Sequence, residues 1–480
     1  MKTFKLSTAT IKKSAISHSA IGLPTAALLY LICLTGTLSV FFEEFERWEQ
    51  PTIEEYRHYS ISQIDTAIAH FQQRVKSKPE TLWVVLPTET MPRMHISGDK
   101  QEWFINQDGS LSAPPLESWT KMVTKLHMQL HLPQNVGLIL VGMLGMMLAS
   151  LILSGLLSHP GLFKDAFRWR TERHALTQAD IHNRLGVWAA PFFLAITLTG
   201  SFIGLMGLFG ALTSVAFYDN NITAVIETVF GDDPVVTQAA PKLEIKKAFQ
   251  TLKAIAPDAS PNYLAIQNID TEGQYMEIAV TLPQRLIFSE IYRFHANGEL
   301  INHQEFSDGE AGRQIAISVY RLHFGSYAGF WLKVIYGILG LALTVVCASG
   351  INIWLLKRKH ESVLNDCWVA VVWGQPLALA ASALFSAFGM EPLGIYCITQ
   401  VLALCYAMAV NNPVQIRKVL MLALIGSLFA IVVSRIAPLF NEAVTTIFNP
   451  INFVIFIVAL MLSALLFHKS RQEQPINPLV

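Results

Sequence analysis

The sequence predicts a mainly α-helical membrane protein that crosses the bilayer eight times and carries two α+β inserts. Three observations support this fold class. Of 480 residues, 52% are hydrophobic and only 15% are charged, whereas soluble domains carry about 25% charged residues. The apolar residues form eight long runs, and an internal repeat relates the first four of them. The formal net charge is zero, which gives no electrostatic indication of nucleic acid binding.

Eight apolar runs are long enough to cross a hydrocarbon core, which takes about 20 helical residues. The first follows a basic start, but it is too long for a signal peptide, so we expect an uncleaved helix. The runs cover about 18–42, 126–157, 182–209, 327–356, 367–388, 391–410, 417–438 and 449–467.

Basic residues indicate the orientation of these spans, because cytoplasmic loops carry an excess of Lys and Arg. With both termini inside, every basic cluster lies in the cytoplasm and both inserts lie outside. For a bacterial inner membrane the outside is the periplasm. The clusters are the N-terminus, 158–181, 357–360, 417–418 and 468–471.

The polar inserts each show a helical period followed by strand-like alternation and a closing turn. The helical runs are Ile61–Val75 and Leu243–Ile255, and the turns contain Asp108-Gly109 and Asn297-Gly298. The strand-like runs are Leu82–Leu86, Met94–Ile96 and Trp103–Ile105, then Tyr275–Leu282 and Leu286–Phe294. The expected units are helix 1 (10–42), insert 1 (43–120), helices 2 and 3 (121–209), insert 2 (210–322), helix 4 (323–360) and the C-terminal spans (361–480).

A repeat relates the first four spans. Ser17–Gly36 and Ile181–Gly200 each contain a His, a Gly four residues later and a Leu-Thr-Gly step, and roughly 27 Å of helix separate the His from the last Gly. Helices 2 and 4 are expected to begin at Leu126-His127 and Leu322-His323. Both contain G-x-x-G and then Ser-Gly, at Ser154-Gly155 and Ser349-Gly350. We therefore expect a four-helix bundle with pseudo-two-fold symmetry about the membrane normal.

The repeat pairs four histidines, His18 with His182 on one side of the membrane and His127 with His323 on the other. Ionisable groups at spans are costly and suggest function, and two facing imidazoles in a bundle can bind a haem iron axially. His131 is a rival ligand or a propionate partner, but the repeat has no equivalent of it. Glycines expected to admit a flat macrocycle, or a neighbouring helix, are Gly22, Gly186, Gly142 and Gly337.

Other motifs are missing from the sequence. It contains no C-x-x-C, G-x-G-x-x-G, P-loop, H-E-x-x-H or G-x-S-x-G. If the paired histidines hold haems that transfer electrons, those electrons would come from a membrane quinol or a separate reductase, because the sequence shows no dinucleotide or flavin domain. The insert histidines are expected to be solvated, and the insert arginines either meet an anionic ligand or are scattered surface charges. These residues are His58, His70, His95, His295 and His303, with Arg93, Arg285, Arg293 and Arg313.

The paired H-x-x-x-G and L-T-G motifs, the Leu-His pairs and the sequence LHFGSYAGFWLKVIYGILGLALTVVCASG at 322–350 resemble the PepSY-associated transmembrane family. The resemblance covers about residues 10–360. It implies periplasmic PepSY-like inserts and two b-type haems in a four-helix bundle. His18, His182, His127 and His323 match the helix-start histidines of that family.

The resemblance further implies an inner-membrane reductase that acts on ferric siderophores at the periplasmic face, for iron uptake. The chain departs from the usual His-Arg at two places, His18-Ser19 and His182-Asn183, with Arg184 as a substitute. Two other functions stay open. The inserts could bind a peptide or protease without redox activity, or the C-terminal spans could form a transport path.

Overall fold

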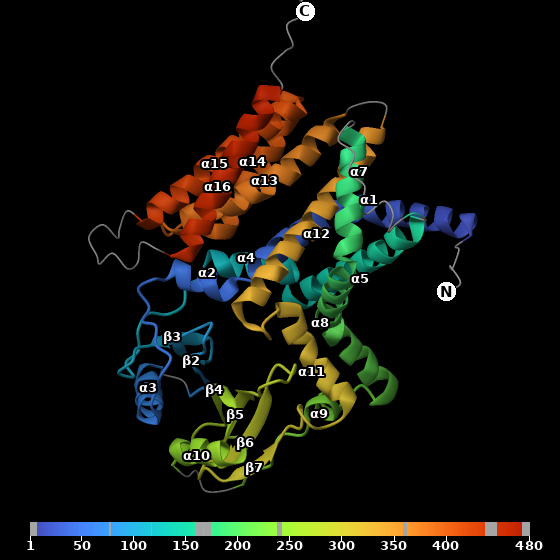
Figure 1. Ribbon diagram of the computed structural model, residues 1–480. Coiled ribbons are helices and arrows are strands. Elements are labelled where there is room, and N and C mark those ends of the chain that lie inside the picture. The colour runs from blue at the N-terminus through green and yellow to red at the C-terminus, as the bar shows by residue number, and fades with distance from the viewer. Residues whose placement is uncertain are drawn as a thin grey trace, which may run out of the picture.

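The computed structural model is mainly helical, with one β-sheet beside the helical part (Figure 1). It describes residues 7–75, 78–116, 118–159, 161, 167, 174–237, 242–358, 362–436 and 449–472. Residues 160, 162–166 and 168–173 of the predicted basic loop at 158–181 therefore lie outside the described residues, as do Lys359 and His360.

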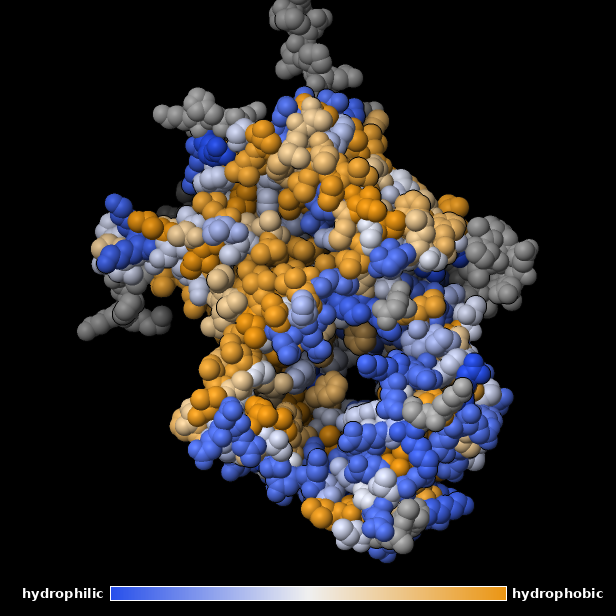
Figure 2. Space-filling view, turned by 180° about the vertical axis from the view of Figure 1, so that it is seen from behind, coloured by the Kyte–Doolittle hydropathy of each residue, from blue (hydrophilic) through white to orange (hydrophobic). Residues whose placement is uncertain are grey.

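Eight helices in the described part of the chain are long and apolar enough to cross a membrane, as predicted. Figure 2 shows apolar side chains over this half of the molecule and polar ones over much of the sheet half. The helices are α1 (Thr8–Ser39), α5 (Gln134–Ser158), α8 (Ala190–Phe217), α12 (Gly329–Lys357), α13 (Val363–Ser386), α14 (Pro392–Val410), α15 (Pro413–Ile436) and α16 (Pro450–Gln472).

The prediction that His127, His182 and His323 lie at the starts of helices 2, 3 and 4 is wrong, because each of them lies on a separate helix that precedes the apolar span. His127 lies in α4 (Trp119–Gln129), His182 in α7 (His174–Trp188) and His323 in α11 (Ala311–Phe324). The first and third breaks have local causes, since Leu130 and Gly325 end their helices in the left-handed conformation. Pro133 then precedes α5 and cannot donate a backbone hydrogen bond.

The first four spans form one packed group. Helix α1 packs against α5 and α12, α5 packs against α8, and α12 packs against α7. Their shared apolar core includes Leu29, Leu148, Phe193 and Leu343.

The strands of both inserts form a single antiparallel sheet of seven strands in the order β3-β2-β1-β4-β5-β6-β7. Two separate units were expected, but β1 pairs with β4 along its whole length, from Thr81 opposite Gln267 to Val85 opposite Tyr263. The strands are β1 (Thr81–Val85), β2 (Met94–Gly98), β3 (Gln101–Ile105), β4 (Ser260–Gln267), β5 (Tyr275–Thr281), β6 (Glu290–His295) and β7 (Leu300–His303).

The two inserts also share one apolar core. Helices α3 (Ile61–Arg74) and α10 (Ile245–Ile255) contribute to it together with strands from both halves. Joining at β1 and β4 gives each of these edge strands a hydrogen-bonding partner, and it allows the small halves to bury their apolar faces together.

The C-terminal helices α13–α16 pack against one another and against α2 (Phe42–Glu49) and α4. In Figure 1 this C-terminal unit, drawn in orange and red, lies on the side of α2 and α4 away from the sheet. A short helix, α9 (Ile222–Phe230), follows α8.

Arg293 is a buried part of the sheet rather than a surface charge. Its Nε donates to Glu277 at 2.8 Å and its Nη2 to Asp233 at 3.0 Å. We expect Arg293→Met to cost about 3 kcal/mol of stability, since the buried Glu277 carboxylate loses its cationic partner and keeps only the hydrogen bond from Gln267. The melting temperature in detergent should fall by several degrees, whereas exposed Arg285→Met should leave it unchanged. Equal melting temperatures for the two variants would show that the ion pair does not stabilise the sheet.

Candidate functional site

The structure brings the four histidines of the repeat together as two pairs. The ring centres of His18 and His182 lie 6.2 Å apart, and those of His127 and His323 lie 6.1 Å apart. Two imidazoles on opposite sides of one metal ion are separated by two metal–nitrogen bonds of about 2.0 Å and one ring radius at each end, about 6 Å in total. Both pairs therefore have the spacing of two axial ligands.

Each histidine contacts the backbone of a neighbouring helix through Nδ1. The acceptor is the carbonyl oxygen of Leu151 for His18 at 2.9 Å and of Val346 for His182 at 3.1 Å. The carbonyl of Ile32 lies 3.0 Å from Nδ1 of His127. Nδ1 of His323 lies 3.1 Å from Oγ1 of Thr199, and His323 also has a backbone hydrogen bond with Ile196.

These hydrogen bonds fix the tautomer of each ring. A carbonyl oxygen only accepts, so Nδ1 carries the proton and Nε2 of the neutral ring keeps its lone pair. Burial lowers the pKa of His127. Burial, together with the neighbouring His127, lowers the pKa of His323 to about 3. Neutral imidazole with a tethered Nδ1 and a free Nε2 is the form that binds metal.

A Ser-Gly or Thr-Gly step lies beside each ring, and we call these four steps the histidine seats. In every seat the Gly follows four residues after the carbonyl that its histidine contacts. A Cβ on the Gly would lie 2.6 to 3.3 Å from Cε1 of the ring. The seats are Ser154-Gly155 for His18, Ser349-Gly350 for His182, Thr35-Gly36 for His127 and Thr199-Gly200 for His323.

The sequence pattern alone assigned no role to the seat residues. The amino-acid sequence nevertheless contained a signal for them, since the repeat includes both the Leu-Thr-Gly and the Ser-Gly steps. What the sequence did not reveal is which histidine each step receives. Helix α1, for example, carries His18 of one pair and the seat of His127 from the other pair.

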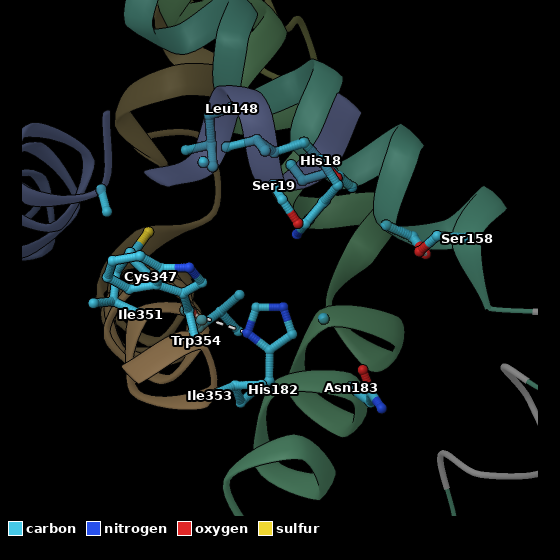
Figure 3. A pocket seen from close by; sticks show the side chains of 18 of the residues that line it. His18, Ser19, Leu148, Ser158, His182, Asn183, Cys347, Ile351, Ile353 and Trp354 are labelled. Atoms are coloured by element: carbon cyan, nitrogen blue, oxygen red, sulfur yellow. Dashed lines mark hydrogen bonds between the residues drawn. The ribbon is translucent and has the colours of Figure 1, made fainter. Parts of the chain in front are cut away.

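A cavity of about 400 Å³ lies at the His18–His182 pair. Figure 3 shows both rings at its wall together with Trp354 and Cys347 of α12, and a dashed line marks a hydrogen bond of His182. The volume is within the range of cofactor sites, about 300–1,000 Å³. The lining is mostly apolar, and its polar members are His18, His182, Ser19, Ser158, His159, Asn183 and Lys357.

The four glycines of the sequence prediction divide into two groups. Gly22 and Gly186 line the cavity, and a Cβ on Gly186 would meet nothing within 4 Å. Gly142 instead lies against Leu205 and Gly204, and Gly337 lies against Phe41. The first two leave room for a ligand, whereas the other two allow close packing.

His131 does not share a helix face with His127, contrary to expectation. The break at Leu130 separates them, and His131 itself has a φ of 53°. Its Nε2 lies 2.9 Å from the carbonyl oxygen of Met122. The nitrogen that the four paired histidines keep free is therefore occupied in His131.

Several insert residues also differ from expectation. Arg93 is 1% exposed and its Nη2 contacts Glu55 and the carbonyl of Gln50. His95 and His295 are only partly exposed, and the Nδ1 atom of each ring is buried, so these two histidines are less solvated than expected. Within the described ranges, no group of three or more His, Cys, Asp or Glu could hold a metal ion. A haem with two axial histidines needs only a pair.

The family model described as the PepSY-associated TM region matches residues 15–357. An uncharacterised protein of Pseudomonas aeruginosa is 27% identical over 236 residues, which are 46% of this chain and 60% of the relative. The chain thus matches less than two thirds of that relative's length. Helices α13–α16 lie beyond the family match.

Proposed function

We propose that this chain, which belongs to the family of the PepSY-associated TM region, holds two b-type haems and transfers electrons across a membrane to a ferric siderophore. The observation that carries the proposal is the geometry of the two histidine pairs. Their ring centres are 6.2 and 6.1 Å apart. Nδ1 lies against a backbone carbonyl in His18, His182 and His127, and against the Thr199 hydroxyl in His323. Both features are those of a bis-histidine haem site.

The residues around the His18–His182 pair fit this cofactor. At the His18–His182 pair, Gly22 and Gly186 line the cavity, which would leave space for the macrocycle. Lys357, Ser19 and Asn183 line the same cavity and would bind carboxylate groups. At the His127–His323 pair, Gly36 and Gly200 leave space for the imidazole rings. Haem held between two histidines supplies reversible one-electron Fe(III)/Fe(II) chemistry.

The residues of the chain orient the ligands and limit access to them. The backbone hydrogen bond at each Nδ1 fixes the ring plane and keeps Nε2 deprotonated. His18 with His182, and His127 with His323, would each hold one haem, and the ferric chelate would receive its electron without being bound to the haem iron. Reduction then favours iron release, because the oxygen ligands of siderophores hold Fe(II) less tightly than Fe(III).

The proposed location is a bacterial inner membrane, with both termini in the cytoplasm and the sheet in the periplasm. The positions of the basic residues in the sequence support this orientation. The sheet would then present the ferric chelate on the side of α4 and α11, which carry His127 and His323. A membrane quinol or a separate reductase would supply electrons on the opposite side.

The test is a dithionite-reduced minus air-oxidised spectrum of the protein purified in detergent, with haem measured per chain. We expect low-spin b-type bands, about two haems per chain, and reoxidation by ferric siderophores under anaerobic conditions. The gallium complexes of the same siderophores are the control, because Ga(III) cannot accept an electron. A colourless protein from haem-replete cells would refute the proposal and favour a peptide-binding or transport role.

A further inference from the structure

The C-terminal unit, α13–α16, contacts the end of the bundle that carries His127. Two buried tryptophans make the contact, Trp48 of α2 and Trp119 of α4. Trp48 Nε1 donates to Asn452 Oδ1 at 2.8 Å, and Trp119 Nε1 donates to the carbonyl oxygen of Leu379 at 2.9 Å. Buried indoles usually find such partners, and here both partners belong to the C-terminal unit.

Helix α4 is also fixed at its first turn. The carboxylate of Glu49, at the end of α2, accepts hydrogen bonds from the backbone N–H groups of Trp119 at 2.8 Å and Thr120 at 2.9 Å. These are donors that a helix leaves without a partner inside itself, and the negative charge is favourable at this end. The guanidinium of Arg435, from α15, lies 4.3 Å from the Trp48 ring centre and donates to the carbonyl of Glu49.

His127 lies on this same helix, two turns beyond Trp119. Helix α4 therefore connects the indole contacts of the C-terminal unit to one member of the second histidine pair. A rotation or shift of α4 would move His127 relative to its seat at Gly36.

Helix α11, which carries His323, is held by different parts of the chain. Arg321 donates to the carbonyl oxygens of Arg285 and Ile287, in the second insert. Tyr336 of α12 donates to the carbonyl of Leu322 at 2.7 Å. The two imidazoles of this pair are thus carried by helices with different supports: α4 packs against α1 and α5 and also contacts the C-terminal unit.

We propose that the C-terminal unit positions His127 as an axial ligand, with Trp119 as the positioning residue. The inference rests on the proposed function, because a ligand position matters only if the pair binds haem. It gives a role to the four spans beyond the family match. The unit sets the position of α4 and thereby the redox potential of the haem at His127 and His323.

The test compares Trp119→Phe with Trp368→Phe in the full-length protein. Both variants keep an aromatic ring and remove one indole hydrogen bond between the C-terminal unit and the bundle. Trp368 Nε1 bonds Asn352 Oδ1 of α12 at 3.0 Å, away from α4. The readouts are haem per chain, the midpoint potential of each haem and hydrogen exchange in residues 119–129.

We expect Trp119→Phe to keep both haems and to raise the potential of the haem at His127, because a less well-placed imidazole stabilises Fe(III) less. Hydrogen exchange in α4 should become about fivefold faster, the effect of losing one hydrogen bond. Trp368→Phe should change neither that potential nor α4 exchange.

Two results separate this inference from the proposed function. If the parent protein holds both haems but Trp119→Phe leaves the potential of the His127 haem unchanged, the positioning role is wrong. If the parent protein holds no haem, the proposed function fails. In that case hydrogen exchange in α4 alone tests whether the C-terminal unit holds α4. Equal exchange rates in the Trp119→Phe and Trp368→Phe variants would show that it does not.

Discussion

Replacing His18 and His182 together by alanine is expected to lower the haem content from about two per chain to about one. The variant removes both axial nitrogens of one pair. The His127–His323 pair keeps its own carbonyl contacts at Ile32 and Ile196, so its haem should stay. Haem per chain and the amplitude of the reduced-minus-oxidised spectrum measure this loss.

Electron paramagnetic resonance can identify which haem remains. The rings of His18 and His182 are nearly perpendicular, at 87°, whereas those of His127 and His323 are nearly parallel, at 16°. Perpendicular ligand planes leave two iron d orbitals almost equal in energy, and parallel planes split them. The double variant should therefore lose the low-spin signal with the larger anisotropy and keep the other.

The matched control for the first prediction is His131→Ala, because His131 uses Nε2 for the Met122 carbonyl. This variant should keep both haems. A double variant of His18 and His182 that still binds two haems would remove these residues as ligands. Loss of both haems from the His131 variant would reinstate His131 as a candidate.

Alanine at Gly36 or Gly200 should weaken the haem site at His127 and His323 without changing any ligand. A Cβ at Gly36 would lie 2.6 Å from Cε1 of His127, and one at Gly200 would lie 2.7 Å from Cε1 of His323. No real Cβ tolerates such a distance, so the ring must move. Overpacking of this kind costs roughly 1–3 kcal/mol, which corresponds to about 5- to 150-fold weaker binding.

The seats provide a graded set of controls for this second prediction. At Gly155 the corresponding distance, to Cε1 of His18, is 3.3 Å, so alanine there should have a smaller effect, on the other haem. Gly207 lies in the same helix as Gly200, and a Cβ there would meet nothing within 4 Å. Haem titration of the apoprotein measures all four variants. Equal affinity in the Gly36, Gly200 and Gly207 variants would show that the seats do not position the histidines.

The number of spans and the candidate histidines could be read from the sequence because both depend on local patterns. A run of about 20 apolar residues is enough to predict a span, and all eight runs became helices. The repeat singled out His18, His182, His127 and His323, and the structure holds them in the expected pairs. Their binding of haem stays a prediction.

The helix breaks were only partly visible in the sequence. Pro133 and Gly325 are ordinary break signals, but the apolar run continues through both, so hydropathy favoured continuous helices. The break at Ala189 also has a sequence signal, because Pro191 follows it in the first turn of α8. As a result, His127 and His323 were assigned to the starts of spans, whereas they lie on α4 and α11.

The sequence by itself determined the composition of the membrane part, the repeat and the residue types of the site. Only the tertiary structure decided which helix each histidine contacts, that β1 pairs with β4, and that α13–α16 contact α4. The physical reason is that these features depend on hydrogen bonds between residues far apart in the chain. Nδ1 of His18, for instance, bonds Leu151, and no local period encodes such a contact.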